Sequence, residues 1–256
     1  MLHPCVRVEP SPAGYLRVRL DRPGRRNALD LGMTRALHAA FTAEPAALVL
    51  VDSTDPGVFC AGADLSVTDA ERASISDLLY DCYEVMITRP GPVIAVLSGP
   101  AVGGGAQLAG AADLRVAGPG AKFRWTGPPG RQVAVGAWLL PSLVGRAAAL
   151  ELIMTGRWVG AAEAERIGLV NHVCADPGPA AAALAGRLLD RGPGVLGSVK
   201  QVAAAGGLLD GLRAERAANQ AAFATPPPGG GERHGAAGKD AGLSVLCGGV
   251  RSLPPH

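Results

Sequence analysis

The sequence is poor in aromatic residues and almost balanced in charge. Aromatic side chains make up 4% of its 256 residues, and the formal net charge is +2 at pH 7, with no block of like charges. Because nucleic-acid surfaces depend on clustered Lys and Arg, we expect no nucleic-acid partner, although a local anion site is compatible with this composition.

Cysteines are few and widely spaced, and they form no CxxC pair. An odd number at such spacing, without clustered histidines, favours free thiols in a reducing compartment over disulfides or metal ligands. We therefore predict a cytoplasmic protein that binds no metal. The five cysteines are Cys5, Cys60, Cys82, Cys174 and Cys247.

The chain also lacks the patterns that direct a protein into or across a membrane. Its first residues, MLHPCVRVEPSP, do not show the charged and then apolar segments of a signal peptide. No run of 18 apolar residues occurs, so the sequence predicts no membrane span.

Short strand-like runs are the first pattern that is present. Residues 5–9 and 14–20 alternate apolar with polar side chains around PSPAG, which predicts an antiparallel hairpin. Residues 46–53 and 92–99 are apolar and rich in β-branched side chains, as is typical of buried strands. A further short strand is expected at 169–173.

Helical patterns alternate with these runs. Leu31, Thr34, Leu37, Ala40 and Phe41 share one face of a helix. Strands that alternate with helices predict an α/β fold with crossover connections. The other expected helices cover residues 72–88, 145–156, 160–169, 177–190 and 209–223.

The last part of the chain differs in composition. From Pro226 to His256, 13 of 31 residues are Gly or Pro, and the apolar periodicity is lost. Such a segment buries too little surface to offset the entropy of ordering it. We therefore expect one domain over residues 1–225 and a poorly ordered tail over 226–256; the abrupt change also fits a disrupted reading frame.

Two glycine-bearing turns follow the predicted strands and suggest a site. VFCAGADLS (58–66) follows the first strand, and the glycines of GPAVGGGAQLA (99–109) stand where a helix should begin. Glycine lets a ligand approach the main chain, and a helix start offers free N–H groups. Each turn alone is an ordinary turn, and Leu108 breaks a GxGxxG dinucleotide pattern. Together the turns could hold one oxygen that gains negative charge.

Four blocks of the sequence resemble the enoyl-CoA hydratase/isomerase, or crotonase, family. They are RPGRRNALD (22–30), FCAGADL (59–65), GPAVGGGAQLA (99–109) and the segment 143–173, in the family's order and spacing. The resemblance implies an α/β crotonase-like spiral of ββα turns with C-terminal helices, assembled as a trimer or hexamer. It also implies an acyl-CoA thioester as ligand, with coenzyme A as part of the substrate and no separate cofactor.

The resemblance assigns roles to individual residues. The N–H groups of Ala63 and Gly104 would form the oxyanion hole. Arg25 and Arg26 suit phosphate oxygens, but a solvated pair of loop residues is an equal alternative. Asp64 fits a turn-stabilising carboxylate better than a catalytic one. The substrate and CoA contacts would come from Arg25, Arg26, Ala28, Ala61, Ala63, Asp64, Leu65, Ser66 and Gly104.

The sequence departs from the family at both acid/base positions. Typical hydratases carry two glutamates there, and Gln107 and Gly127 stand in their place; neither can accept a proton near neutral pH. His38 and His172 lie outside the expected site. Some family members lack both glutamates and bind long acyl-CoAs without hydrating them, and a mycobacterial example matches at Gln107 and near Trp138.

Further residues near Gly127 leave two interpretations open. Arg124, Trp125 and Arg131 surround the missing glutamate and either line an acyl pocket or belong to a surface loop.

Three functions remain open from the sequence. The first is weak or altered hydration or isomerisation of an enoyl-CoA. The second is a non-catalytic acyl-CoA carrier that acts through protein partners. The third, favoured by the unusual tail, is a degenerate product without a stable function.

Overall fold

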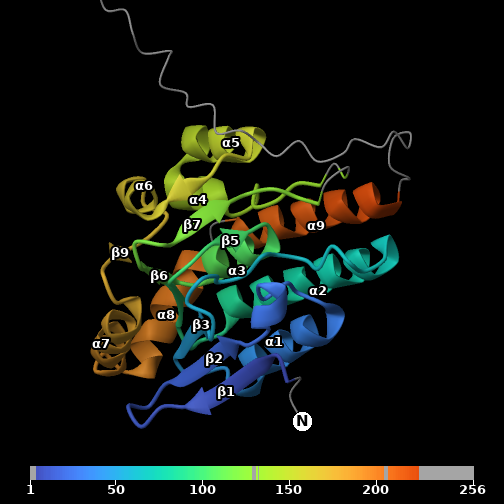
Figure 1. Cartoon of the computed structure of the whole chain (residues 1–256). Helices are drawn as coiled ribbons and strands as arrows, with labels where there is room; N and C mark the ends of the chain where they lie inside the picture. Colours follow the sequence, from blue (N-terminus) through green and yellow to red (C-terminus); the bar gives the residue numbers. More distant parts are fainter. Residues whose placement is uncertain (1–3, 129–130, 132, 205–206, 225–256) are drawn as a thin grey trace, which may run out of the picture. The chain divides into compact units, whose positions relative to one another are not determined.

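The computed structural model describes residues 4–128, 131, 133–204 and 207–224. The predicted tail at 226–256 and Cys247 lie outside these residues. Figure 1 shows strands and helices alternating along the chain, as the sequence predicts. In the described part, no helix is both long and apolar enough to cross a membrane.

A six-stranded sheet forms the centre of the fold, in the order β1-β2-β3-β4-β6-β9. The predicted hairpin is present as the antiparallel pair β1–β2, and the remaining pairs are parallel. Parallel neighbours require crossover connections, which the helices supply. The strands are β1 (Val6–Pro10), β2 (Leu16–Leu20), β3 (Val49–Ser53), β4 (Val93–Leu97), β6 (Leu114–Ala117) and β9 (His172–Val173).

Both faces of β3 and β4 are buried over residues 49–51 and 93–97, which explains the apolar sequence of these two stretches. Val49 and Val93 pack in the larger core cluster, whereas Leu50 and Ile94 pack against helix α7 on the opposite face. Because successive strand residues point to opposite faces, a strand covered on both sides must be apolar throughout.

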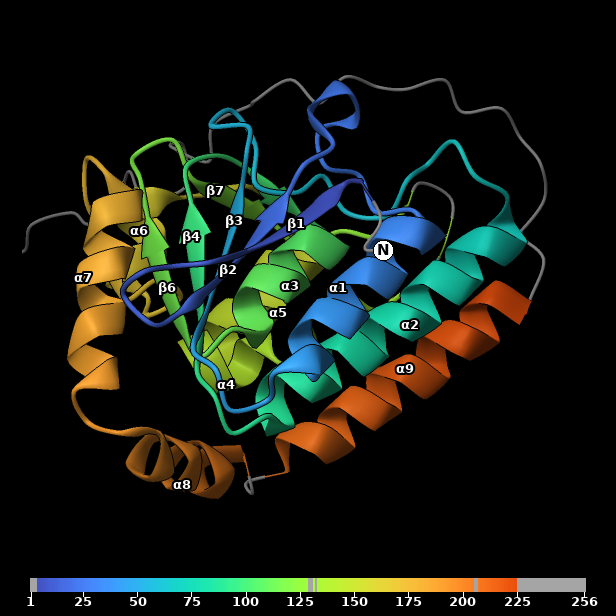
Figure 2. The ribbon, with the colours of Figure 1, turned by 90° about the horizontal axis from the view of Figure 1, so that it is seen from below.

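Helices cover the two faces of the sheet unequally. Figure 2 shows α1, α2 and α9 side by side on one side and α7 on the other. The start of α2 is fixed by a capping box between Thr68 and Glu71. These helices are α1 (Leu31–Ala43), α2 (Asp69–Thr88), α7 (Pro177–Leu189) and α9 (Leu208–Ala224).

The remaining elements flank this frame. A small second sheet, in the order β5-β7-β8, lies beside helix α3. Helix α8 (Pro193–Ala204) was not expected from the sequence, because Pro193, Gly194 and Gly197 are helix-breaking signals. The others are β5 (Ala101–Val102), α3 (Gly104–Ala111), β7 (Lys122–Arg124), α4 (Leu140–Val144), α5 (Arg146–Thr155), β8 (Val159–Gly160), α6 (Ala161–Arg166) and the 3-10 helix η1 (Pro23–Arg25).

Candidate functional site

The two glycine-bearing turns meet at the carboxyl ends of β3 and β4. Pro100 O accepts hydrogen bonds from the backbone N–H groups of Phe59 (2.9 Å) and Cys60 (3.2 Å). The N–H of Val102 donates to Cys60 O at 2.9 Å. Because β3 and β4 are adjacent parallel strands, the turns that follow them form one hydrogen-bonded backbone unit.

Glycine is required where the two turns touch. Gly62 has a φ of 85°, and a Cβ atom there would lie 2.7 Å from Val102 O. A Cβ on Gly105 would lie 2.4 Å from Cys60 O. Any side chain at either position would force the turns apart, so the glycines secure the close approach.

Two backbone N–H groups at this junction donate no hydrogen bond to any described residue. Gly104 begins α3, where the first N–H groups cannot bond within the helix. In the described part of the chain, neither the N–H of Ala63 nor that of Gly104 donates a hydrogen bond. Both residues line the same cavity, and the positive end of the α3 dipole adds to the attraction for negative charge.

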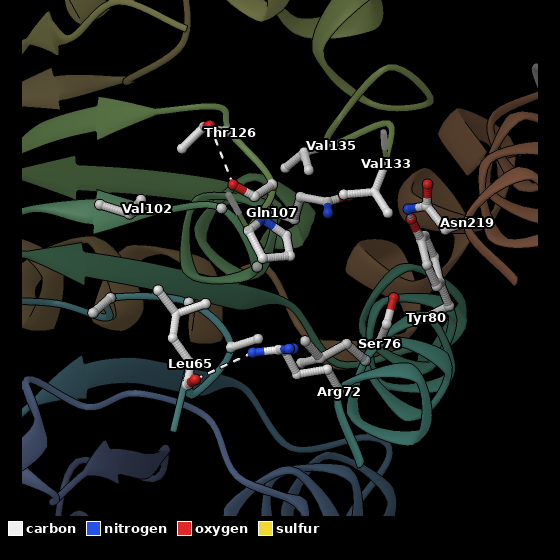
Figure 3. A pocket seen from close by; sticks show the side chains of 18 of the residues that line it. Leu65, Arg72, Ser76, Tyr80, Val102, Gln107, Thr126, Val133, Val135 and Asn219 are labelled. Atoms are coloured by element: carbon white, nitrogen blue, oxygen red, sulfur yellow. Dashed lines mark hydrogen bonds between the residues drawn. The ribbon is translucent and has the colours of Figure 1, made fainter. Parts of the chain in front are cut away.

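The cavity at this junction measures about 330 Å³. Figure 3 shows Leu65, Val102, Val133 and Val135 around it, together with the polar side chains of Gln107 and Arg72. None of the described residues that line the cavity is Asp, Glu or His. The wall is mainly apolar and, over that part, carries no carboxylate or imidazole.

Gln107 and Gly127, the two degenerate positions, both lie on the cavity wall. Gln107 is buried, and its Oε1 accepts a hydrogen bond from Trp138 Nε1 at 2.7 Å. The φ of Gly127 lies outside the left-handed range, but a Cβ atom there would lie 2.2 Å from Val133 Cγ2. A side chain at position 127 therefore requires Val133 to move.

A polar cluster that was not predicted joins α2 to α9, and two of its members, Tyr80 and Asn219, line the cavity. The Tyr80 hydroxyl donates to Glu215 Oε1 at 2.9 Å, and Asn219 Nδ2 donates to the Tyr80 oxygen at 2.7 Å. Glu215 also accepts from the N–H groups of Gly136 (2.9 Å) and Trp138 (3.0 Å). Burial raises the pKa of Glu215, although these donors oppose the shift.

The sequence pattern that could have indicated this cluster is the helical spacing of three residues in α9. Leu212, Glu215 and Asn219 stand at i, i+3 and i+7, on one face of α9, and all three are buried. A glutamate on a helix is normally solvated, and only the tertiary structure places Tyr80 opposite it.

The loop proposed to contact coenzyme A lies against the first turn. Ala61 N donates to Arg26 O at 3.1 Å, and Leu29 N donates to Gly62 O at 2.8 Å. Arg25 and Arg26 are exposed, and neither forms a salt bridge within the described part of the chain. Their guanidinium groups are therefore available to a ligand.

The other residues predicted to contact the substrate or coenzyme A lie either within the turn or at the protein surface. Asp64 is buried outside the cavity lining, where its carboxylate bonds Arg22 Nη1 at 2.8 Å and Ser66 N at 2.9 Å. Burial opposes ionisation of Asp64, but the hydrogen bonds from Ser66 and Arg22 outweigh it and lower its pKa to about 2. Leu65 and Ser66 are exposed, and Ala28 is half-buried.

The three residues that surround Gly127 in the sequence have different surroundings in the structure. Arg124 lines the cavity, whereas Trp125 is buried outside the lining. Arg131 forms an ion pair with Asp69. His38, on α1, and His172, on β9, do not line the cavity.

Comparison with known sequences decides the family. The sequence model described as enoyl-CoA hydratase/isomerase matches residues 11–229. The chain belongs to the enoyl-CoA hydratase/isomerase family.

Two curated members illustrate how far the similarity extends. The chain is 36% identical over 203 residues to "Probable enoyl-CoA hydratase 2, mitochondrial" of Arabidopsis thaliana, over 73% of this chain and 66% of that protein. It is 38% identical over 167 residues to "Probable enoyl-CoA hydratase echA6" of Mycobacterium tuberculosis, over 62% of this chain and 66% of that protein. The match thus spans just under two thirds of each relative.

Solved structures confirm the crotonase-like α/β fold. An enoyl-CoA hydratase/isomerase from Xanthobacter autotrophicus superposes with a TM-score of 0.77 at 27% identity, over 86% of this chain and 87% of that one. Another, from Mycobacterium paratuberculosis, gives 0.78 at 25% identity, over 88% and 95%.

Proposed function

We propose that this protein binds an acyl-CoA thioester whose carbonyl oxygen accepts hydrogen bonds from the N–H groups of Ala63 and Gly104. The observation that carries the proposal is that Ala63 and Gly104, whose N–H groups donate to no described residue, both line one mainly apolar cavity. An apolar cavity suits an acyl chain, and paired N–H groups suit an oxygen that gains negative charge.

The coenzyme A moiety would lie across the loop that packs against Ala61. Arg25 and Arg26 would bind its phosphates, because exposed guanidinium groups pair well with phosphate oxygens. Ala28, Ala61, Leu65 and Ser66 would contribute the remaining contacts, with Asp64 holding the turn. No further cofactor is required.

Chemistry at this site would be weak or altered hydration or isomerisation of an enoyl-CoA. Gln107 and Gly127 provide no carboxylate, and a positioned acid/base group contributes typically 10²–10⁴-fold to a rate. The absence of Asp, Glu and His from the described cavity lining equally favours a second function, an acyl-CoA carrier that acts through protein partners. A cytoplasmic homotrimer or hexamer remains part of the proposal.

The proposal is tested by replacing the thioester carbonyl group of the ligand with a methylene group. Butanoyl-CoA and S-butyl-CoA differ in the thioester carbonyl oxygen, so calorimetry on the intact protein isolates its hydrogen bonds. Two neutral hydrogen bonds should make butanoyl-CoA bind roughly 10- to 30-fold more tightly. Equal affinities would contradict the proposed oxyanion hole. Failure of both ligands to bind would contradict acyl-CoA binding as a whole.

A further inference from the structure

The side chain of Gln107 is held in one orientation by Trp138. An indole N–H can only donate a hydrogen bond, so the group that faces Trp138 Nε1 at 2.7 Å must be the amide oxygen. The acceptor of Gln107 is thereby engaged, and its amide nitrogen is directed to the other side.

Trp138 is itself fixed to the same site. Its backbone N–H donates to Glu215 Oε2 at 3.0 Å, and its ring stacks on Tyr83 with the centroids 6.0 Å apart. The Tyr83 hydroxyl donates to Gly104 O at 2.9 Å. The orientation of the Gln107 amide is thus coupled to the turn that carries Gly104.

Tyr80 and Gln107 both line the cavity, and Tyr80 leaves the Gln107 amide at least one free hydrogen. The Tyr80 hydrogen is committed to Glu215, which as a carboxylate can only accept. Tyr80 therefore accepts from Asn219, and its oxygen can take at most one hydrogen from the Gln107 amide. Because a glutamine amide carries two hydrogens, at least one remains for the cavity that Gln107 lines.

The position of Gln107 on α3 indicates which atoms of a bound acyl chain its amide nitrogen would face. Gln107 follows Gly104 by three residues, which is about 4.5 Å along a helix axis. With the thioester oxygen at the N–H of Gly104, the Gln107 amide faces the acyl atoms just beyond the thioester. An alkene carbon offers this donor no acceptor, whereas a carbonyl oxygen on the third acyl carbon does.

We infer that the cavity selects 3-oxoacyl-CoA thioesters, whose 3-oxo oxygen accepts a hydrogen bond from Gln107 Nε2. Trp138 acts as the positioning residue for that donor. The inference rests on the proposed function, since it names the class of acyl group bound at the same site. A glutamate at position 107 would repel this oxygen when ionised, so the replacement by glutamine gains a physical reason.

The test compares acetoacetyl-CoA with butanoyl-CoA, which lacks the 3-oxo group, by calorimetry on the full chain. One neutral hydrogen bond should give acetoacetyl-CoA a roughly 3- to 10-fold advantage in Kd. Gln107→Met should bring the ratio close to one. Trp138→Phe should reduce it, because the amide can then turn its oxygen toward the ligand.

Two matched controls and a double variant complete the design. Gln201→Met and Trp158→Phe change the same residue types at positions outside the cavity lining and should preserve the ratio. If Gln107→Met folds poorly because the Trp138 N–H loses its acceptor, Gln107→Met with Trp138→Phe removes both groups and should also give a ratio close to one.

The outcomes separate the two proposals. Binding of butanoyl-CoA without an advantage for acetoacetyl-CoA, or an advantage that survives in the Gln107→Met variants, overturns the inference and leaves acyl-CoA binding intact. Failure of both ligands to bind overturns acyl-CoA binding as well.

Discussion

At the scale of single residues, Gln107 and Gly127 set what the cavity can do. Both line it, and neither can take a proton. The family resemblance predicted that they belong to one site, and in the structure both line the same cavity. The sequence could not reveal that Trp138 holds the Gln107 amide or that Val133 fills the space beside Gly127, because both facts depend on contacts between distant segments.

Restoring both carboxylates should produce hydration of crotonyl-CoA. Gln107→Glu or Gly127→Glu alone should change turnover little, because residues that act as a unit are non-additive. The pair should exceed either single variant by roughly 100-fold or more. The measurement is the loss of enoyl absorbance.

The design must make room for the second carboxylate. A side chain at 127 meets Val133 Cγ2, so each variant is also made with Val133→Ala, and Val133→Ala alone serves as control. A pair that gains no more than the sum of the single variants, with and without Val133→Ala, would show that these positions do not work together.

At the scale of elements, the long and strongly patterned segments were predictable, but α8 was not. Pro193, Gly194 and Gly197 argue against a helix, whereas a tertiary contact stabilises it. Lys200 is buried, and its Nζ bonds Met86 O at 2.6 Å and Asp113 Oδ2 at 2.7 Å. Such an anchor between remote segments leaves no periodic signal in the sequence.

Removing the Lys200 charge should destabilise the fold. Lys200→Met leaves the half-buried Asp113 without its ion-pair partner, and losing this charged hydrogen bond should cost about 2 kcal/mol of unfolding free energy. Denaturant unfolding measures the loss. Asp113→Asn in the Lys200→Met background should recover part of it, whereas the exposed Gln201→Met on the same helix should change stability by less than about 0.5 kcal/mol. If Lys200→Met leaves the free energy of unfolding unchanged, other contacts hold α8 in place.

At the scale of the whole molecule, the predicted α/β fold and crotonase-like spiral are confirmed by the solved family members. The alternation of apolar runs and helical patterns was sufficient for the fold class, and the four sequence blocks for the family. The link between α2 and α9 through Tyr80 and Glu215 was not predictable, because it joins residues far apart in the sequence.

Truncation after Thr225 should leave thermal stability unchanged, because residues 226–256 have the composition of a segment that buries little surface. Truncation after Ala204 removes α9 with its buried Leu212 and Glu215 and should lower the melting temperature by roughly 10 °C or more. Size-exclusion chromatography follows the oligomer in parallel. Equal losses in the two truncated chains would mean that residues 226–256 contribute to the packed structure.

We propose that this cavity holds an acyl-CoA thioester without hydrating it efficiently. The most direct measurement combines crotonyl-CoA binding by calorimetry with turnover on the same sample of unmodified protein. We predict saturable binding and turnover far below one event per second, because the described cavity lining contains no Asp, Glu or His. Hydration at tens of turnovers per second, the rate of an ordinary enzyme, would contradict the account.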